Sequence, residues 1–326
     1  TPLPLREDIV VSVCFADLAP SPAAFDAVRA LAERLDAVYR FREIILVVED
    51  SMREAFLPLV EDVRELRLFV VGPASDYYER RVIAAEEAIG DLVLIGAADE
   101  IGQIDALAFL DHTEAVDAVT LATRERHSRL TTALTLPIIA IGRLAGFKVN
   151  LNDLQTIAMP RTALNQLLAH EEPRLALRFP PRDPRVPFNC LRIDARRIAR
   201  SRATGLARRL QLLQTLLVYL APTILSLVAL ASSLLALLGL AFAAYVVGAF
   251  VLVDNLAPGW LTTSAMLTVS AVFMGVSMLG LSLGMSHVLR QIGRGGTARM
   301  AEEVNRIDLF GKVRNDLNVE LESAER

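Results

Sequence analysis

Acidic residues follow three short apolar runs in the first hundred positions of this sequence. The acids are Asp17, Glu49, Asp50, Asp99 and Glu100. The runs that precede them are Ile9–Phe15, Ile44–Val48 and Leu92–Ile95. Carboxylate oxygens are the ligands that hard cations such as Mg²⁺ prefer, and they also accept hydrogen bonds from polar ligands. The first question is whether the fold brings these acids to one place.

Strand and helix patterns alternate along the first half of the chain. Further strand patterns are Leu68–Val71, Ala115–Leu121 and Lys148–Leu151. Helical spacing is present in Ala23–Tyr39, Phe56–Leu66 and Tyr77–Ile89, which Gly90 would close as a C-cap, and another helix is expected to start near Ile101. The alternation predicts an α/β fold with a mostly parallel sheet and helices on both faces. Such sheets bind ligands at the carboxyl ends of their strands, where the acids stand.

The chain as a whole is too apolar for an ordinary soluble protein, and two long uncharged stretches lie in its second half. The 326 residues are 53% hydrophobic with a mean hydropathy of +0.40, well above average usage. No charged residue occurs from Leu210 to Val253 or from Asn255 to Leu289. A membrane crossing needs about 20 apolar residues. Two transmembrane helices are therefore predicted, near Thr223–Val253 and Trp260–His287.

Arginines flank the two apolar spans, whereas the connection between them, DNLAPGW, has no basic residue. Seven arginines and one acid lie between Arg192 and Arg209. The positive-inside rule then predicts a multi-pass inner-membrane protein with the main domain and both termini in the cytoplasm. A nucleic-acid patch is the rival interpretation of the arginines. The net charge of −4 and the adjacent apolar helix favour anionic lipid headgroups instead.

These patterns divide the chain into four parts. They are an α/β domain (1–190), basic juxtamembrane amphipathic helices (191–220), two transmembrane helices (221–290) and a helical cytoplasmic tail (291–326). The proline-rich segment Pro173–Phe188 predicts an irregular loop, and the partly apolar tail predicts a contact with the main domain or a neighbouring subunit. Glycines at 275, 280 and 284 allow close helix packing in lipid, which predicts an oligomer.

Several segments match motifs in a fixed order. They are Ile44–Ser51 (IILVVEDS), Ala88–Leu94 (AIGDLVL), Val116–Arg126 and Asp153–Arg161 (DLQTIAMPR). This order resembles the family 2 glycosyltransferases of the GT-A fold. The apolar tail, with Pro222, Pro258-Gly259-Trp260 and Leu279–Gly284, resembles the polyprenyl-phosphate group of that family, the dolichyl-phosphate mannose synthase-like and GtrB-like proteins.

The resemblance implies a hexosyltransferase that moves a sugar from a nucleotide sugar to polyprenyl phosphate, with Mg²⁺ or Mn²⁺ on the diphosphate. It implies donor binding by Asp17, Glu49 and Asp50 and a catalytic Asp153 near the acceptor phosphate. The candidates for the metal are Asp99 and Glu100, which directly follow the position of the family's metal ligands. The residues implied for the lipid phosphate are Arg124, Arg126, Arg161, Arg196, Arg197, Arg200 and Arg202. A homotetramer is the family-based expectation. The expected partners are membrane lipids and the two substrates, without nucleic acid.

The sequence departs from the family at the residues that carry the chemistry. Cys14-Phe15-Ala16-Asp17 has no Tyr-Asn pair, and Gly96-Ala97-Ala98 stands where the family has its metal carboxylates. Two interpretations remain open. In one, the loop has slid and Asp99 or Glu100 reaches the metal. In the other, these acids are solvated at the start of a helix and the chain is a pseudo-glycosyltransferase, a structural or assembly subunit of a membrane complex. Each arginine could instead pair with surface acids or lipid headgroups.

Overall fold

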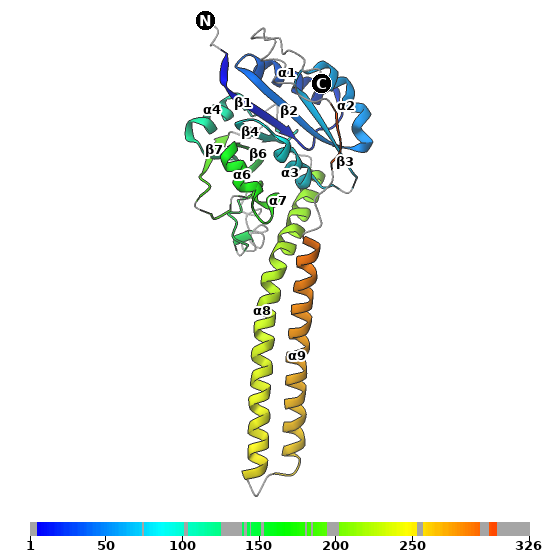
Figure 1. Cartoon of the computed structure of the whole chain (residues 1–326), viewed down its shortest axis with the longest axis vertical. Helices are drawn as coiled ribbons and strands as arrows, with labels where there is room; N and C mark the ends of the chain where they lie inside the picture. Colours follow the sequence, from blue (N-terminus) through cyan, green and yellow to red (C-terminus); the bar gives the residue numbers. More distant parts are fainter. Residues whose placement is uncertain are drawn as a thin grey trace, which may run out of the picture. The chain divides into compact units, whose positions relative to one another are not determined.

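The computed structural model describes residues 5–73, 75–100, 104–124, 139, 142–143, 145–150, 153–179, 181–183, 185–193, 202–252, 257–293 and 300–304. The chain divides into two compact units (Figure 1). The first comprises Thr1–Leu213 together with Ala298–Arg326, and the second comprises Gln214–Thr297.

The first unit is built on an eight-stranded sheet in the order β7-β5-β6-β4-β1-β2-β3-β8 (Figure 1). The strands are β1 (Arg6–Phe15), β2 (Tyr39–Glu49), β3 (Leu66–Val71), β4 (Leu92–Gly96), β5 (Val119–Arg124), β6 (Asp153–Pro160), β7 (Phe188–Ile193) and β8 (Met300–Val304). Strands β1 to β4 run parallel to their neighbours among themselves, whereas β6 and β8 are antiparallel to theirs. Strand order reverses between β1 and β4, which is where such sheets bind ligands.

Helices cover both faces of this mixed sheet, as the sequence predicted (Figure 1). They are α1 (Pro22–Asp36), the single-turn η1 (Asp50–Met52), α2 (Arg53–Asp62), α3 (Tyr77–Glu87), α4 (Ala106–Val116), α6 (Arg161–Leu168) and the short α7 (Pro173–Ala176). Alternate residues of β1 face opposite sides. Val11 and Val13 join the core formed with α1, α2 and α4, while Cys14 contacts α3. The two faces therefore have different chemistry, one apolar and one partly polar.

Helix α3 has a side-chain N-cap, and its C-terminal end differs from the predicted one. Its N-cap Asp76 accepts a hydrogen bond from Glu79 N at 2.7 Å. The helix ends at Glu87, so Gly90 is not the C-cap that the sequence predicted. A Cβ at Gly90 would lie 2.7 Å from Ser12 N and 2.8 Å from Val10 O. Gly90 is required by the close approach of this segment to β1.

Three predicted elements are wrong in position. Ala115–Leu121 is not one strand, because α4 continues to Val116 and β5 starts only after Asp117, which has a left-handed φ of 49°. Lys148–Asn150 is irregular rather than a strand, and the next strand begins at Asp153. The helix expected near Ile101 begins at Ala106, and residues 101–103 lie outside the described chain.

The tail contributes a strand where its periodicity predicted a helix. Met300–Val304 forms β8, antiparallel to β3, with Val304 opposite Leu68 and Glu302 opposite Val70. Strand β3 is buried along its whole length, and one of its edges would be unpaired without β8. Pairing with this edge therefore outweighs the helical preference of residues 300–304. The predicted contact between tail and main domain is present. Residues 305–326 are outside the described part of the chain.

The second unit consists of two long helices, α8 (Arg202–Leu252, which begins in the first unit) and α9 (Trp260–Gly293). Both are long and apolar enough to cross a membrane, with mean hydropathies of 2.5 and 1.9 in an 18-residue window of Leu210–Leu252 and of Trp260–Val288. Helix α8 is continuous through Pro222, so the amphipathic segment expected at 211–220 is part of it.

Close packing of α8 and α9 involves one of the three glycines singled out in the sequence. A Cβ at Gly275 would lie 2.9 Å from Ser232 O and 2.8 Å from Ala236 N. Nothing lies within 4 Å of the corresponding positions at Gly280 and Gly284. Gly275 therefore serves packing within the chain, and only the other two glycines remain open for contacts between chains.

Candidate functional site

The loops after β1 and β4 meet at the point where strand order reverses. Phe15 and Gly96 are register partners at the ends of these parallel strands. Beyond them, Asp17 Oδ1 accepts a hydrogen bond from Ala98 N at 2.9 Å. Asp17 was predicted to bind the sugar donor. The structure places it as a tie between the two loops that would border a ligand crevice.

The space beside this tie is filled mainly by the Phe15 ring. A Cβ at Gly96 would lie 2.5 Å from Phe15 Cε1, and Phe15 itself is buried. The cavity that remains is lined by Leu31, Glu100 and Thr156 among others and measures about 10 Å³. That volume holds about one water molecule. This cavity is too small for a nucleotide.

Glu100 is fully buried and hydrogen-bonded to β6. The chain turns directly after β4, where Glu100 N donates to Ala97 O at 3.0 Å. The Glu100 carboxylate then accepts hydrogen bonds from Gln155 N at 3.0 Å, Thr156 N at 2.8 Å and Thr156 Oγ1 at 2.7 Å. The expectation of a solvated acid is wrong for Glu100, which is 0% exposed. This carboxylate anchors the loop after β4 to its neighbouring strand.

The described residues at this loop do not fit a divalent cation. Mg²⁺ and Mn²⁺ need several oxygen ligands around one point. Glu100 uses both carboxylate oxygens for N–H and O–H donors, and Asp99 is half-buried beside it. Within the described part of the chain, no three His, Cys, Asp or Glu side chains gather closely enough to hold a metal ion. No chemical step in this site is therefore assigned to a metal.

Glu49 and Asp50 lie at the carboxyl end of β2, the second place predicted to contact a sugar donor. Glu49 pairs with Arg80 of α3, with Oε1 2.5 Å from Nη1. Asp50 is the first residue of η1 and is exposed. Its carboxylate is in solvent and is not buried over a ligand crevice. Both positions remain predictions as donor contacts.

Asp153, predicted to be catalytic, is the first residue of β6 and is 2% exposed. Its Oδ1 accepts hydrogen bonds from Thr123 Oγ1 and Asn150 Nδ2, both at 2.8 Å. Burial raises the pKa of the Asp153 carboxyl, against the opposing effects of Thr123, Arg178 and Asn150. The side chain is enclosed by protein donors, and its catalytic role stays a prediction.

Among the arginines assigned to a lipid phosphate, the side chain of Arg161 is the one that the structure describes. Arg161 donates from Nη1 to Ala88 O, and its backbone N donates to Asp91 O at 2.7 Å, so it holds the start of α6 to the segment after α3. Arg124 ends β5 and Arg202 begins α8. The remaining four, Arg126, Arg196, Arg197 and Arg200, lie outside the described residues.

Two buried arginines that the sequence analysis missed hold the start of β6. Arg81 of α3 donates to Gln155 O at 2.7 Å, and Arg178 donates to Asp153 O and Leu154 O, both at 2.8 Å. A signal for Arg81 existed in the sequence. It lies four residues after Tyr77 and three before Ala84, on the apolar stripe of its own helix.

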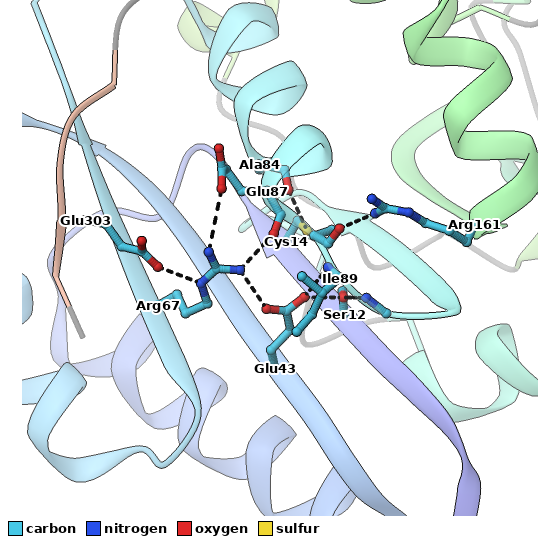
Figure 2. Close-up of polar contacts among 11 residues, drawn as sticks. Ser12, Cys14, Glu43, Arg67, Ala84, Glu87, Ile89, Arg161 and Glu303 are labelled. Carbon is cyan, nitrogen blue, oxygen red and sulfur yellow. Dashed lines mark hydrogen bonds and ion pairs between the residues drawn. The ribbon is translucent and has the colours of Figure 1, made fainter. Parts of the chain in front are cut away.

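A second buried acid, Glu43, lies within β2 (Figure 2). Ser12 Oγ donates to Glu43 Oε1 at 2.5 Å, and Ile89 N donates to the same oxygen at 2.7 Å. Arg67 Nη1 donates to Glu43 Oε2 at 3.1 Å. Figure 2 shows these side chains converging from β1, β2 and β3. A buried ion pair of this kind is tolerated only when its remaining hydrogen bonds are made.

This cluster also fixes the C-terminal end of α3. Arg67 Nη1 donates to Glu87 O at 2.7 Å, and Gly90 N donates to Ser12 Oγ at 2.7 Å. Cys14 Sγ donates to Ala84 O at 3.4 Å. Burial, with a further contribution from Glu43, raises the pKa of the Cys14 thiol well above its usual range. Cys14 is therefore a neutral packing group and not a nucleophile.

Comparison with known proteins gives matches among solved structures only. No family model matches the sequence, and no curated protein matches it. Glucosyl-3-phosphoglycerate synthase from Mycobacterium tuberculosis, in complex with uridine diphosphate, is 15% identical with a TM-score of 0.41, over 65% of this chain and 80% of that one. The same enzyme with Mg²⁺ and uridine diphosphate gives 14% and 0.43, over 65% and 79%.

S. aureus TarS is 14% identical with a TM-score of 0.32, over 56% of this chain and 57% of that one. Such identities bear on fold and not on substrate. The class of the protein follows from its own structure. It is an α/β protein with a mixed sheet, a crossover point between β1 and β4, and two C-terminal helices suited to a membrane.

Proposed function

We propose that this chain is a membrane-anchored, glycosyltransferase-like protein without metal-dependent sugar transfer, acting as a structural or assembly subunit of a membrane complex. The observation that supports the proposal most is the state of Glu100. Its carboxylate is 0% exposed and accepts three hydrogen bonds from Gln155 and Thr156. An acid held in this way maintains the fold of the loop, and both of its oxygens are already bound to donors of β6.

The missing carboxylates at the end of β4 also support the proposal. When a nucleotide sugar reacts, negative charge develops on the departing diphosphate, and in metal-dependent enzymes a divalent cation stabilises it. Gly96-Ala97-Ala98 supplies no carboxylate to hold a metal at the end of β4. Asp17, the nearest acid after β1, accepts the hydrogen bond of Ala98 N. Asp17 and Glu100 thus shape the loops after β1 and β4.

The competing function is transfer of a hexose from a nucleotide sugar to polyprenyl phosphate. Glu49 and Asp50 at the end of β2, beside Asp17 at the end of β1, are the observation in its favour. In that reaction a phosphate oxygen of the lipid forms a bond to the anomeric carbon while the bond to the nucleoside diphosphate breaks, and the configuration inverts. A single displacement of this kind needs no protein nucleophile.

Transfer measurements distinguish the two functions. The full-length protein in nanodiscs would be supplied with polyprenyl phosphate and radiolabelled UDP- or GDP-sugars, with and without Mn²⁺. We expect no product above that of empty nanodiscs under any condition, and the same result for Glu100→Gln. Metal-dependent product formation by the unaltered chain would contradict the proposal and establish the competing function.

The proposed placement in the membrane rests on the arginines before α8 and on the uncharged connection between the helices. Both termini and the α/β unit lie in the cytoplasm, and Arg196, Arg197, Arg200 and Arg202 bind anionic headgroups. A membrane-impermeant thiol reagent added outside intact cells should label a cysteine at Asn255 and spare one at Ser323. The reverse labelling pattern would contradict this topology.

The proposed assembly is a homo-oligomer, with four chains as the expected number. Gly280 and Gly284 stand one helical turn apart on α9, and nothing fills the space beside their Cβ positions. Small residues at this spacing allow helices to approach closely in lipid. The mass of the protein in nanodiscs should fall from oligomer to monomer when both glycines are replaced by isoleucine. A monomeric mass for the unaltered chain would contradict the assembly.

A further inference from the structure

The chain returns from its second apolar helix to complete the sheet of the first unit. Residues 294–299 connect the end of α9 to β8. Strand β8 lies at one end of the sheet, paired only with β3, and the register places Glu303 opposite Phe69. Its Val304 side chain packs against the apolar core. The last described element of the chain therefore covers an edge formed by residues more than two hundred positions earlier.

Strand β3 needs such a cover. All six of its residues, from Leu66 to Val71, are buried. An apolar edge strand with free N–H and C=O groups pairs readily with other chains and promotes aggregation. Strand β8 satisfies this edge, and it presents the acidic pair Glu302 and Glu303 in place of a continuous apolar strand. Charged side chains are a common means of protecting a sheet edge.

Two ion pairs hold β8, and they differ in burial. Glu303 Oε1 lies 2.9 Å from Arg67 Nε, with side chains that are 20% and 11% exposed. Glu302 Oε1 lies 2.9 Å from Arg53 Nη2, with side chains that are 49% and 38% exposed. Exposed pairs of the second kind contribute little to stability because water competes for them. The Glu303–Arg67 pair is thus the stronger attachment.

Arg67 connects β8 to the interior of the unit (Figure 2). Its Nη1 donates to Glu43 and to Glu87 O, its Nη2 pairs with Glu87 Oε2 at 3.6 Å, and its Nε donates to Glu303. Loss of β8 would leave Nε without its acceptor beside a buried ion pair. A hydrogen bond between charged groups is stronger than a neutral one, so the contact of Glu303 with Arg67 favours the attached state.

We propose that β8 is a latch strand, a detachable edge strand that is held by Glu303 on Arg67 and closes β3. The latch forms only when residues 300–304 pair with β3. Whether this edge of β3 is paired or open therefore depends on the C-terminal part of the chain. This inference concerns β3 and β8 alone and does not depend on the absence of sugar transfer.

Hydrogen exchange of the full-length protein in nanodiscs tests the latch. In Glu303→Gln, the amides of Leu68–Val71 that face β8 should exchange at least about tenfold faster, which corresponds to about 1.4 kcal/mol. In the matched control Glu302→Gln, the increase should stay within about twofold. Amides of Val11–Val13 in β1 should not change in either variant. Equal effects of the two variants, or no effect of Glu303→Gln, would overturn the proposal.

A cross-link provides the second test. Arg53→Cys and Glu302→Cys introduce two exposed thiols at a known contact, in a background where the exposed Cys190 is replaced by serine. A short bismaleimide should join them within one chain, and in Glu303→Gln the cross-link should restore protection of β3. A dimer band on a denaturing gel would mean that β8 comes from a second copy, and failure to restore protection would mean that the latch is not the cause. Either result overturns the proposal.

Discussion

Glu43 and Glu100 are both fully buried acids beside the central strands, and they are held in opposite ways. Glu43 shares a salt bridge with Arg67 and also accepts hydrogen bonds from Ser12 and Ile89 N. Glu100 accepts hydrogen bonds from two backbone N–H groups and a threonine hydroxyl of β6. One acid belongs to an ionic cluster that joins three strands to α3. The other is a loop anchor built largely on backbone donors.

The role of a buried acid follows from the donors that its carboxylate oxygens accept hydrogen bonds from, and not from its position along a strand. Glu100 stands at the crossover point of the sheet, where a functional acid is expected, whereas Glu43 lies in mid-strand. Both are nevertheless structural in their contacts. Buried carboxylates persist in proteins only when their charge or hydrogen-bonding capacity is met. In this protein, N–H and O–H groups of the chain satisfy the carboxylates of both Glu43 and Glu100.

The largest expected effect comes from breaking the ionic cluster. Arg67→Met removes the partner of Glu43 and leaves a buried charge, which should lower the free energy of unfolding by about 3–5 kcal/mol. Pulse proteolysis in urea on the full-length protein measures this. Arg29→Met, whose exposed pairs with Asp26 and Asp62 lie on the surface, is the control and should have no comparable effect. If both variants lost a similar free energy of unfolding, the buried cluster would contribute no more to stability than the surface pairs, which would contradict the prediction.

Breaking the loop anchor should have the next largest effect. Glu100→Ala leaves Gln155 N and Thr156 N without their acceptor and should lower the free energy of unfolding by about 2–3 kcal/mol. The neighbouring Asp99→Ala should cost about 0.5 kcal/mol, as is usual away from such anchors. Urea unfolding of both variants under the same conditions provides the measurement. A larger loss for Asp99→Ala would show that the wrong acid has been identified as the anchor.

A smaller effect is expected from crowding the filled crevice. Gly96→Ala places a Cβ against the Phe15 ring and should destabilise the protein by roughly 1–3 kcal/mol. Adding Phe15→Leu should recover part of this loss, because the smaller side chain vacates the space of the clash. Thermal unfolding of the single and double variants checks the coupling. Purely additive losses would mean that Phe15 does not fill the position beside Gly96.

The smallest effect is a pH dependence at Asp153. Burial raises its pKa above 3.8, so the native carboxyl holds its proton more tightly than the unfolded chain does. Stability from this group is therefore greatest at low pH and is lost as the pH rises through the raised pKa. Wild-type stability relative to Asp153→Asn should fall from about pH 4 upward and then level off. A relative stability that rises with pH would contradict the raised pKa.

Local patterns predicted much of the fold. The apolar runs that became β1, β2 and β4 were recognised because each is short, buried and followed by a polar turn. The strand expected at Ala115–Leu121 was misplaced because the left-handed Asp117 separates a helix from a strand inside one apolar run. The sequence of residues 300–304 alone does not predict strand β8. Its five residues become a strand only because the distant β3 offers an edge.

The sequence predicted where these acids lie in the sheet but not which groups they contact. The sequence located Asp17, Asp99 and Glu100 at the crossover point of the sheet, but their partners come from other strands. Donors to Glu100 lie 55 and 56 residues away, on β6, and the donor to Asp17 lies 81 residues away. Such pairings leave no trace in local spacing. The Glu43 cluster was missed for the same reason, since Ser12 and Arg67 meet it only across the sheet.

Binding of Mn²⁺ in the presence of UDP tests most directly whether the acids after β4 are structural. The paramagnetic resonance signal of free Mn²⁺ would be recorded with the full-length protein in nanodiscs, as Mn²⁺ is added with and without saturating UDP. Because Glu100 is occupied by β6 and no carboxylate stands at 96–98, the signal should equal that of a protein-free sample with UDP. A saturable loss of free Mn²⁺ that requires UDP and disappears in Asp99→Asn or Glu100→Gln would contradict the account.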